Sequence, residues 1–130
     1  MIVLDASAVV AWLLRQPNEA RIAARMFGRG QTLHAPHLLD VEVCQALRKC
    51  VLSGLMTDTE GTEALRDFAS LPVRRYEHEP LLERIWDLRA NLTAYDAVYV
   101  TLAEALSAPL VTCDVRLRGA SGHTAKVEVL

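Results

Sequence analysis

The sequence has no long apolar run, and its start does not look like a targeting signal. No stretch approaches the ~20 consecutive apolar residues that a membrane-spanning helix needs. The opening Met1-Ile2-Val3-Leu4 meets an acid at once and lacks the basic start of a secretory signal peptide. We therefore expect a cytoplasmic protein that makes no membrane contact.

Cysteine and basic charge are also scarce. The three cysteines, Cys44, Cys50 and Cys113, are scattered and form no C-x-x-C pair, which argues against a disulfide framework and against a zinc site. The formal net charge of -2 is not the basic footprint that nucleic-acid-binding proteins usually carry. If a metal neutralised four of the 16 acids, the 14 basic residues would face 12 acids and leave the remaining surface at +2. Contact with RNA is therefore permitted by the charge.

The chain does have enough apolar residues for one folded unit. At 130 residues and 52% hydrophobic, it can bury a core of its own as a single domain over residues 1–130. Short apolar runs predict strands at residues 2–4 and 110–113, and β-prone segments predict strands at 32–35, 73–76 and 126–129. Strands that alternate with helices predict a three-layer α/β fold, in which a mainly parallel sheet lies between two layers of helices.

Helix signals fill the segments between these strands. Apolar spacing and helix-ending residues predict helices at residues 7–14, 18–28, 38–53, 80–89, 94–106 and 115–118, with a further helix after residue 57. Asn18 and Thr93 are predicted to cap the helices that begin directly after them. Thr57 and Glu60 have the S/T-x-x-E spacing of a capping box.

Four acids lie next to apolar segments rather than in polar ones. Asp5 ends the first strand, and Asp114 ends the strand at 110–113. Parallel sheets bind ligands at the carboxyl ends of their strands, so these two acids converge if the strands are neighbours. Asp96 lies in the first turn of an apolar helix, and Glu42 lies near the start of the helix at 38–53.

Each acid also has an ordinary structural interpretation. Asp5 and Asp114 could cap the helices after them, while Asp96 and Glu42 could suit a helix dipole. As a cluster they need compensation, because two like charges ~4 Å apart repel by about 4 kcal/mol at an effective dielectric near 20. Mg²⁺ or Mn²⁺ prefers such oxygen ligands. Bound there, a metal would activate water for phosphodiester hydrolysis.

Two other classes of function remain open at this point. A phosphotransfer enzyme would need a second aspartate two residues after Asp5, where the sequence has Ser7. A signalling receiver would need a lysine after a late strand, and only Lys126 is available. A non-catalytic interaction protein, in which the acids only cap helices, is the other alternative. Metal titration would separate it from an enzyme.

Four motifs, in this order along the chain, resemble those of a known family. They are Leu4-Asp5-Ala6-Ser7, Ala35-Pro36-x-x-Leu39-x-x-Glu42, Leu92-x-x-Tyr95-Asp96-Ala97-x-Tyr99-Val100-x-Leu102-Ala103-Glu104, and Leu110-Val111-Thr112-Cys113-Asp114. Together they are similar to the signatures of PIN-domain ribonucleases. More narrowly, they resemble VapC, the toxin of bacterial toxin-antitoxin pairs.

The resemblance implies a fold, an activity and a set of site residues. It implies a parallel sheet flanked by helices, Mg²⁺ or Mn²⁺ as cofactor, and endonucleolytic cutting of RNA. It assigns the catalytic and metal-binding acids to Asp5, Glu42, Asp96 and Asp114. Ser7 and Thr112 match polar residues that lie beside the metal in the family.

The resemblance also implies partners. Members of the family usually form homodimers and are inhibited by a VapB antitoxin, whose tail covers the acidic site. DNA would be contacted only through the antitoxin. Arg116 and Arg118 come soon after Asp114, and Arg48 with Lys49 lies within two turns of Glu42, so all four are candidates for RNA contact or for a plain solvated face. Four apolar residues could belong to the core, to a dimer surface or to an antitoxin groove: Leu47, Val51, Leu55 and Met56.

Overall fold

The centre of the molecule is a five-stranded sheet in which every neighbouring pair is parallel. The computed structural model describes residues 1–130, and the strand order is β3-β2-β1-β4-β5. The strands are β1 (Ile2–Leu4), β2 (Leu33–Pro36), β3 (Val73–Tyr76), β4 (Leu110–Thr112) and β5 (Val127–Val129). The predicted parallel sheet is thereby confirmed.

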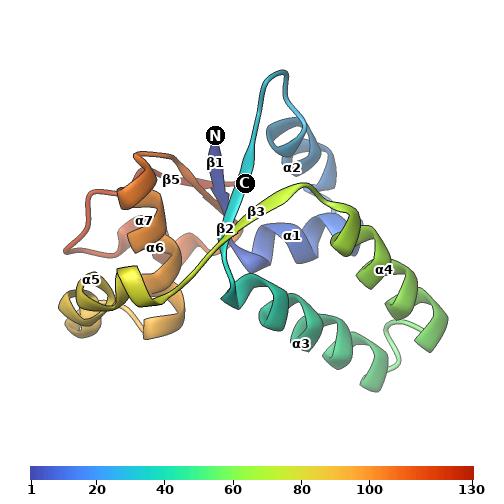
Figure 1. The fold of residues 1–130 in the computed structure, drawn as a ribbon. Coiled ribbons are helices and arrows are strands. Elements are labelled where there is room, and N and C mark those ends of the chain that lie inside the picture. Colours follow the sequence, from blue (N-terminus) through green and yellow to red (C-terminus); the bar gives the residue numbers. More distant parts are fainter.

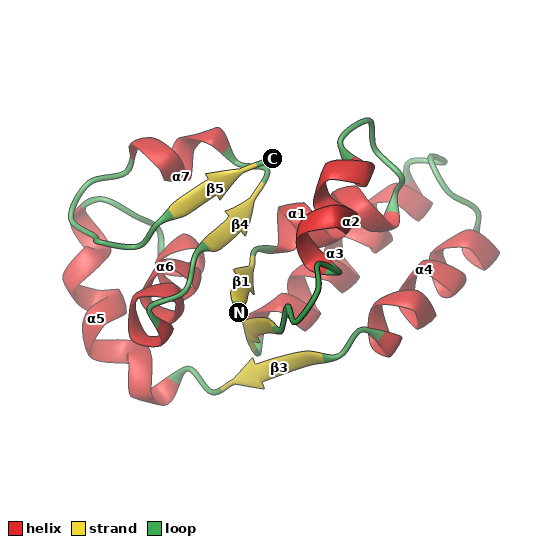
Figure 2. Ribbon diagram, turned by 90° about the horizontal axis from the view of Figure 1, so that it is seen from above, coloured by secondary structure: helices red, strands yellow, loops and turns green.

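Helices cover both faces of this sheet. One side carries α1 (Ala6–Leu13), α2 (Glu19–Met26), α3 (Leu38–Leu52) and α4 (Asp58–Ser70). The other side carries α5 (Leu82–Asp87), between the 3-10 turns η1 (Glu79–Leu81) and η2 (Leu88–Ala90), and α6 (Ala94–Leu106). The short helix α7 (Val115–Gly119) packs against β5. Figures 1 and 2 show the two sets of helices on opposite sides of the strands, which confirms the three-layer α/β fold.

The strand order creates a switch point between β1 and β4. From β1 the chain moves outward through β2 to β3, and it then returns through α5 and α6 to place β4 on the other side of β1. Right-handed crossovers in opposite directions put their helices on opposite faces of a sheet. Open parallel sheets place their ligand sites at the carboxyl ends of the strands beside such a switch point.

The core is built around the central strand. Ile2, Val3 and Leu4 are each 0% exposed, because β1 has a strand on each side and helices over both faces. They belong to a continuous cluster of 29 buried apolar residues. Burial of such side chains supplies most of the driving force for folding. The strand β1, which ends at Asp5, is therefore fixed in the centre of the core.

Local capping signals were correct in two places and wrong in one. Thr57 and Glu60 form the predicted capping box at α4, and the Thr93 side chain caps α6. Asn18 precedes α2 but its side chain makes no cap bond. It donates instead to the carbonyl of Leu130, 3.1 Å away, so a long-range contact replaces the predicted local one.

Helix continuity was also overestimated once. The single helix predicted for residues 80–89 is divided into η1, α5 and η2. Leu81 and Leu88 are its buried residues, and the tighter 3-10 turns at both ends carry these two side chains onto the core. None of the helices in the structure has the length and apolar character needed to cross a membrane.

Candidate active site

The four predicted acids come from four different helix beginnings at the switch-point end of the sheet. Asp5 lies between β1 and α1, and Asp114 lies between β4 and α7. Asp96 is in the first turn of α6, and Glu42 is in the second turn of α3. The backbone N–H of Asp5 donates to the carbonyl of Val111 at 3.0 Å, so β1 and β4 are the neighbours that convergence of these acids required.

Asp5 is the most deeply buried of the four, and two hydroxyl groups hold it. Asp5 is 8% exposed. The Thr112 hydroxyl donates to Asp5 Oδ2 at 2.7 Å, and the Ser7 hydroxyl donates to the same oxygen. The two hydroxyl oxygens lie 3.1 Å apart. Asp5 makes no side-chain bond to cap α1, so the capping interpretation of this acid is wrong.

Thr112 and Ser7 also tie the acid to the backbone directly after β4. The N–H of Asp114 donates to Thr112 Oγ1 at 3.0 Å, and the N–H of Cys113 donates to Ser7 Oγ at 2.9 Å. Each hydroxyl thus accepts from the backbone and donates to Asp5. This arrangement fixes the rotamer of Asp5 and leaves its Oδ1 without a hydrogen bond from the chain.

Glu42 receives a hydrogen bond from a tyrosine on the opposite side of the sheet. The Tyr99 hydroxyl donates to Glu42 Oε2 at 2.5 Å, and Tyr99 is only 1% exposed. Burial raises the pKa of Glu42, the Tyr99 bond opposes this rise, and the charges of Asp5 and Asp96 add to it. Burial, followed by the bond to Glu42, raises the pKa of Tyr99 so far that the phenol stays protonated.

Asp96 is half-buried and shares the negative field of the others. Burial raises its pKa first, and the charges of Asp5 and Asp114 raise it further, while Arg116 opposes the shift. The backbone N–H of Asp96 donates to Thr93 Oγ1 at 3.2 Å, which is the bond that caps α6. The side chain of Asp96 makes no ion pair.

Asp114 differs from the other three because it already has a positive partner. The Arg116 guanidinium contacts both of its oxygens at 2.5–3.0 Å, and the Arg116 backbone N–H donates to Oδ1 at 2.9 Å. These bonds lower the pKa of Asp114. Asp114 therefore does cap α7, as its structural interpretation predicted, and it also lies at the rim of the acidic site.

The acids act on one another electrostatically, but they do not form a closed cage. No group of three or more histidine, cysteine or acidic side chains is gathered tightly enough to hold an ion as it stands. Burial is the largest cause of the raised pKa of Glu42 and of Asp96, and neighbouring acids raise both further, so these carboxylates act on one another through their charges.

The donor set fits a hard divalent cation. Every candidate ligand is an oxygen, from carboxylates and hydroxyls, and no cysteine or histidine contacts these acids through a hydrogen bond. Mg²⁺ and Mn²⁺ prefer such ligands, and Mg²⁺ commonly keeps several waters beside one or two carboxylates. Asp5 and Glu42 each keep one oxygen free of hydrogen bonds from the chain.

The candidate RNA-contacting residues are on the surface, but only Arg116 contacts one of the four acids. Arg116 is bound to Asp114, whereas Arg118 on α7 and Arg48 with Lys49 on α3 are exposed and make no ion pair within the chain. They are free to contact a polyanion.

One residue of the site was missed by the sequence reasoning. Tyr99 is part of the motif around Asp96 but is not among the predicted site residues, whereas its hydroxyl reaches Glu42, 57 positions away in the sequence. A tyrosine in an otherwise aliphatic, buried helix face was the available signal, because a buried phenol needs a hydrogen-bond partner.

The sequence matches a known family along most of its length. Residues 2–122 match the PIN domain, and the chain belongs to the PIN-domain family. Ribonuclease VapC12 of Mycobacterium tuberculosis (strain ATCC 25618 / H37Rv) is 47% identical over 130 residues, which cover 100% of this chain and 99% of that protein. Ribonuclease VapC9 of the same strain is 45% identical over 117 residues, or 90% of this chain and 88% of that protein. Within the family, the chain therefore groups with the VapC ribonucleases.

A solved structure shows the same fold. The crystal structure of VapBC2 from Rickettsia felis bound to a DNA fragment from their promoter matches with a TM-score of 0.74 at 15% identity, over 99% of this chain and 98% of that one. The predicted family and fold are thus confirmed. The alternative of a phosphotransfer or receiver domain is wrong, because residues 2–122 match the PIN domain.

Proposed function

We propose that this chain is a Mg²⁺- or Mn²⁺-dependent endoribonuclease, the toxin of a type II toxin-antitoxin pair, and that residues 1–130 act as one PIN-like domain. The observation that supports this most is the convergence of four acids on the β1–β4 switch point, with opposed pKa shifts that a divalent cation would compensate. Curated relatives that are 45–47% identical are named as ribonucleases. A cytoplasmic location remains a prediction.

In this proposal Asp5, Glu42, Asp96 and Asp114 are the catalytic and metal-binding acids. A bound Mg²⁺ or Mn²⁺ would supply an activated water and stabilise the charge that develops on the phosphate. Asp5 would act as a fixed ligand, because its orientation is set by two hydroxyl donors at one of its oxygens.

Ser7 and Thr112 would be supporting residues that do not bind the metal themselves. Both donate to Asp5, and both accept from the backbone after β4. They thereby couple the position of Asp5 to the position of Asp114. Such partners of metal ligands commonly determine metal affinity as strongly as the ligands do.

RNA would approach over the basic residues near the acids. Arg116 and Arg118 lie beside Asp114, and Arg48 and Lys49 lie farther along α3. Contacts from such residues to phosphates position a nucleic acid without reading its sequence. Replacing Arg118 with Gln should weaken RNA binding similarly for all sequences and reduce its dependence on salt.

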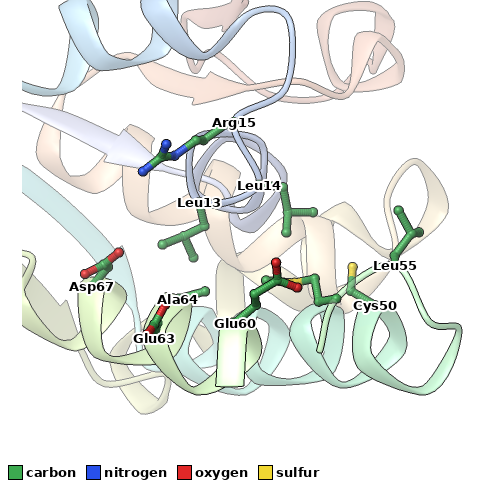
Figure 3. A pocket seen from close by; sticks show the side chains of 10 residues that line it. Leu13, Leu14, Arg15, Cys50, Leu55, Glu60, Glu63, Ala64 and Asp67 are labelled. Carbon is green, nitrogen blue, oxygen red and sulfur yellow. The ribbon is translucent and has the colours of Figure 1, made fainter. Parts of the chain in front are cut away.

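An antitoxin would have a suitable surface in a hollow beside α1. The hollow has a volume of about 460 Å³ and lies between the end of α1, the end of α3 and the length of α4. Figure 3 shows Leu13, Leu14 and Leu55 exposed to it, with acidic side chains of α4 along one wall. The acids are Glu60, Glu63 and Asp67.

This combination of an apolar floor and an acidic wall fits a basic amphipathic segment, as proposed for a VapB-type antitoxin. Leu55 is 80% exposed, while Leu47 is buried in the core. Of the apolar set that was open in the sequence, Leu55 and Met56 line this hollow and Leu47 does not. Leu55→Glu should lower the affinity for a co-purified small partner by roughly tenfold or more, while cleavage of RNA by the free chain stays unchanged.

A homodimer is part of the same proposal, and contact with DNA would occur only through the antitoxin. Several large apolar side chains outside the hollow are well exposed, including Trp86 at 68% and Val41 at 67%. Large exposed apolar side chains such as these are candidates for burial in an interface between two copies of the chain. Light scattering of the purified chain would determine its oligomeric state directly.

The decisive experiment is to map cleavage ends in RNA. Total RNA incubated with the purified chain and Mg²⁺ should acquire discrete new ends, and a chelator should prevent them. Asp5→Asn should remove the ends, whereas Asp87→Asn, which changes an exposed acid on α5, should not. Cleavage that survives both the chelator and Asp5→Asn would refute a metal-dependent nuclease at this site.

A further inference from the structure

Tyr99 and Glu42 form a buried contact between two elements that lie on opposite faces of the sheet. Tyr99 belongs to α6 and Glu42 to α3, and the bond from the phenol to Glu42 Oε2 is 2.5 Å long. The tyrosine is 1% exposed, so it cannot turn away to another partner without disturbing the core. The phenol is therefore a fixed donor directed at one oxygen of the carboxylate.

The same pattern is present at Asp5, built from different residues. Thr112 and Ser7 both donate to Asp5 Oδ2, and no group of the chain donates to Oδ1. At Glu42 the occupied oxygen is Oε2 and the unbonded one is Oε1. Two acids from distant parts of the sequence thus each have one oxygen held by hydroxyl groups and one oxygen available.

We propose that Tyr99 is a positioning residue, which holds Glu42 so that only Oε1 is presented to the cation and which thereby favours Mg²⁺ and Mn²⁺ over Ca²⁺. This inference rests on the proposed metal-dependent nuclease and goes beyond it, because it assigns the choice of cation to a residue that does not touch the metal. Tyr99 acts only through Glu42.

The physical reason lies in how the two kinds of cation use carboxylates. Mg²⁺ requires near-octahedral geometry and binds single carboxylate oxygens together with water, whereas Ca²⁺ takes 6–8 oxygens and often binds both oxygens of one carboxylate. A hydroxyl donor at Oε2 disfavours the two-oxygen mode, because Ca²⁺ would have to displace it. Groups that orient metal ligands in this way typically change metal affinity by roughly 10- to 100-fold when they are removed.

The test removes the single oxygen atom of the phenol. In Tyr99→Phe the ring is kept, so the packing of α6 is preserved while Glu42 loses its donor. The matched control is Tyr76→Phe, which removes the same atom from a tyrosine on β3 whose hydroxyl lies 2.8 Å from His34 Nδ1. Dissociation constants for Mg²⁺, Mn²⁺ and Ca²⁺ are measured by calorimetry on the full chain, together with kcat and KM for RNA.

We expect Tyr99→Phe to lower the affinity for Mg²⁺ and Mn²⁺ by roughly 10-fold or more and the affinity for Ca²⁺ by clearly less. The preference for Mg²⁺ over Ca²⁺ should therefore fall. The KM for RNA at saturating Mg²⁺ should stay within about twofold, since the phenol is buried away from the substrate. Tyr76→Phe should leave all three affinities as in the wild type.

Three other results would count against the inference in distinguishable ways. An equal loss of affinity for all three cations, or the same loss in Tyr76→Phe, would show a purely structural role for the phenol. Unchanged affinities in Tyr99→Phe, with a wild type that cleaves RNA, would refute the positioning role and leave the proposed nuclease intact. A wild type that binds none of the cations would refute both.

Discussion

Thr112→Val isolates the support of Asp5 with little change in shape. Thr112 is 0% exposed, and valine has nearly the same volume, so no cavity is created. The substitution removes the 2.7 Å bond to the Asp5 carboxylate and the acceptor of the Asp114 N–H at 3.0 Å. A hydrogen bond to a charged group contributes about 1.5–3 kcal/mol, and an orphaned N–H adds about 1 kcal/mol. We therefore expect a loss of about 2.5–4 kcal/mol in the free energy of unfolding.

The assay is urea unfolding in the presence of a chelator, with Thr101→Val as the matched control. Thr101 is 3% exposed, and its hydroxyl is buried without a hydrogen-bond partner. Removing an unsatisfied buried hydroxyl should leave stability unchanged or raise it by about 1 kcal/mol. If Thr112→Val costs no more than Thr101→Val, the hydroxyl support of Asp5 contributes nothing and the reasoning is refuted.

Three further predictions concern the metal-free chain. Burial and neighbouring acids raise the pKa of Asp96, so the stability that its protonated form contributes is lost as pH rises through that pKa. Asp96→Asn should therefore be about as stable as the wild type below about pH 4 and increasingly more stable at higher pH. A difference in the free energy of unfolding that stays constant across a pH series of urea melts would contradict this. Gly61→Ala places a Cβ 2.7 Å from Val51 Cγ2 and should lower the free energy of unfolding by about 1 kcal/mol. Calorimetric melting would detect this loss, and adding Val51→Ala should relieve the clash. Thr57→Ala breaks the capping box with Glu60 and should cost about 1 kcal/mol in urea unfolding; an unchanged midpoint would exclude a role for the cap.

Most of the fold could be predicted because its signals are local. The strand at residues 73–76 and the helix at 94–106 have the predicted bounds, since the β propensity of Val73 and Tyr76 and a threonine cap act over a few neighbouring positions. The strand order β3-β2-β1-β4-β5 could not be predicted in the same way. It depends on which apolar edges meet after the chain returns from β3, and no residue pattern within one strand encodes that choice.

The location of the acids was predictable for a related reason. Asp5 and Asp114 come directly after buried strands, and the carboxyl ends of parallel strands lie at the same edge of a sheet. Their hydrogen-bond partners were not predictable, because those depend on side-chain directions in three dimensions. Tyr99 reaches Glu42 across 57 positions, and the Asp5 carboxylate is held by Thr112, 107 positions away.

The metal-free protein moderates the repulsion among its acids in two different ways. Burial raises the pKa of Glu42 and Asp96, so at these two positions the charged form is disfavoured. At Asp114 the charge is kept, and the Arg116 guanidinium neutralises it. Asp114 would hold a divalent cation together with the other acids, and the cation would then supply positive charge that only Arg116 supplies in the metal-free protein. Arg116 would be shared between Asp114 and an RNA phosphate, because it cannot hold both anions in a bidentate fashion at once.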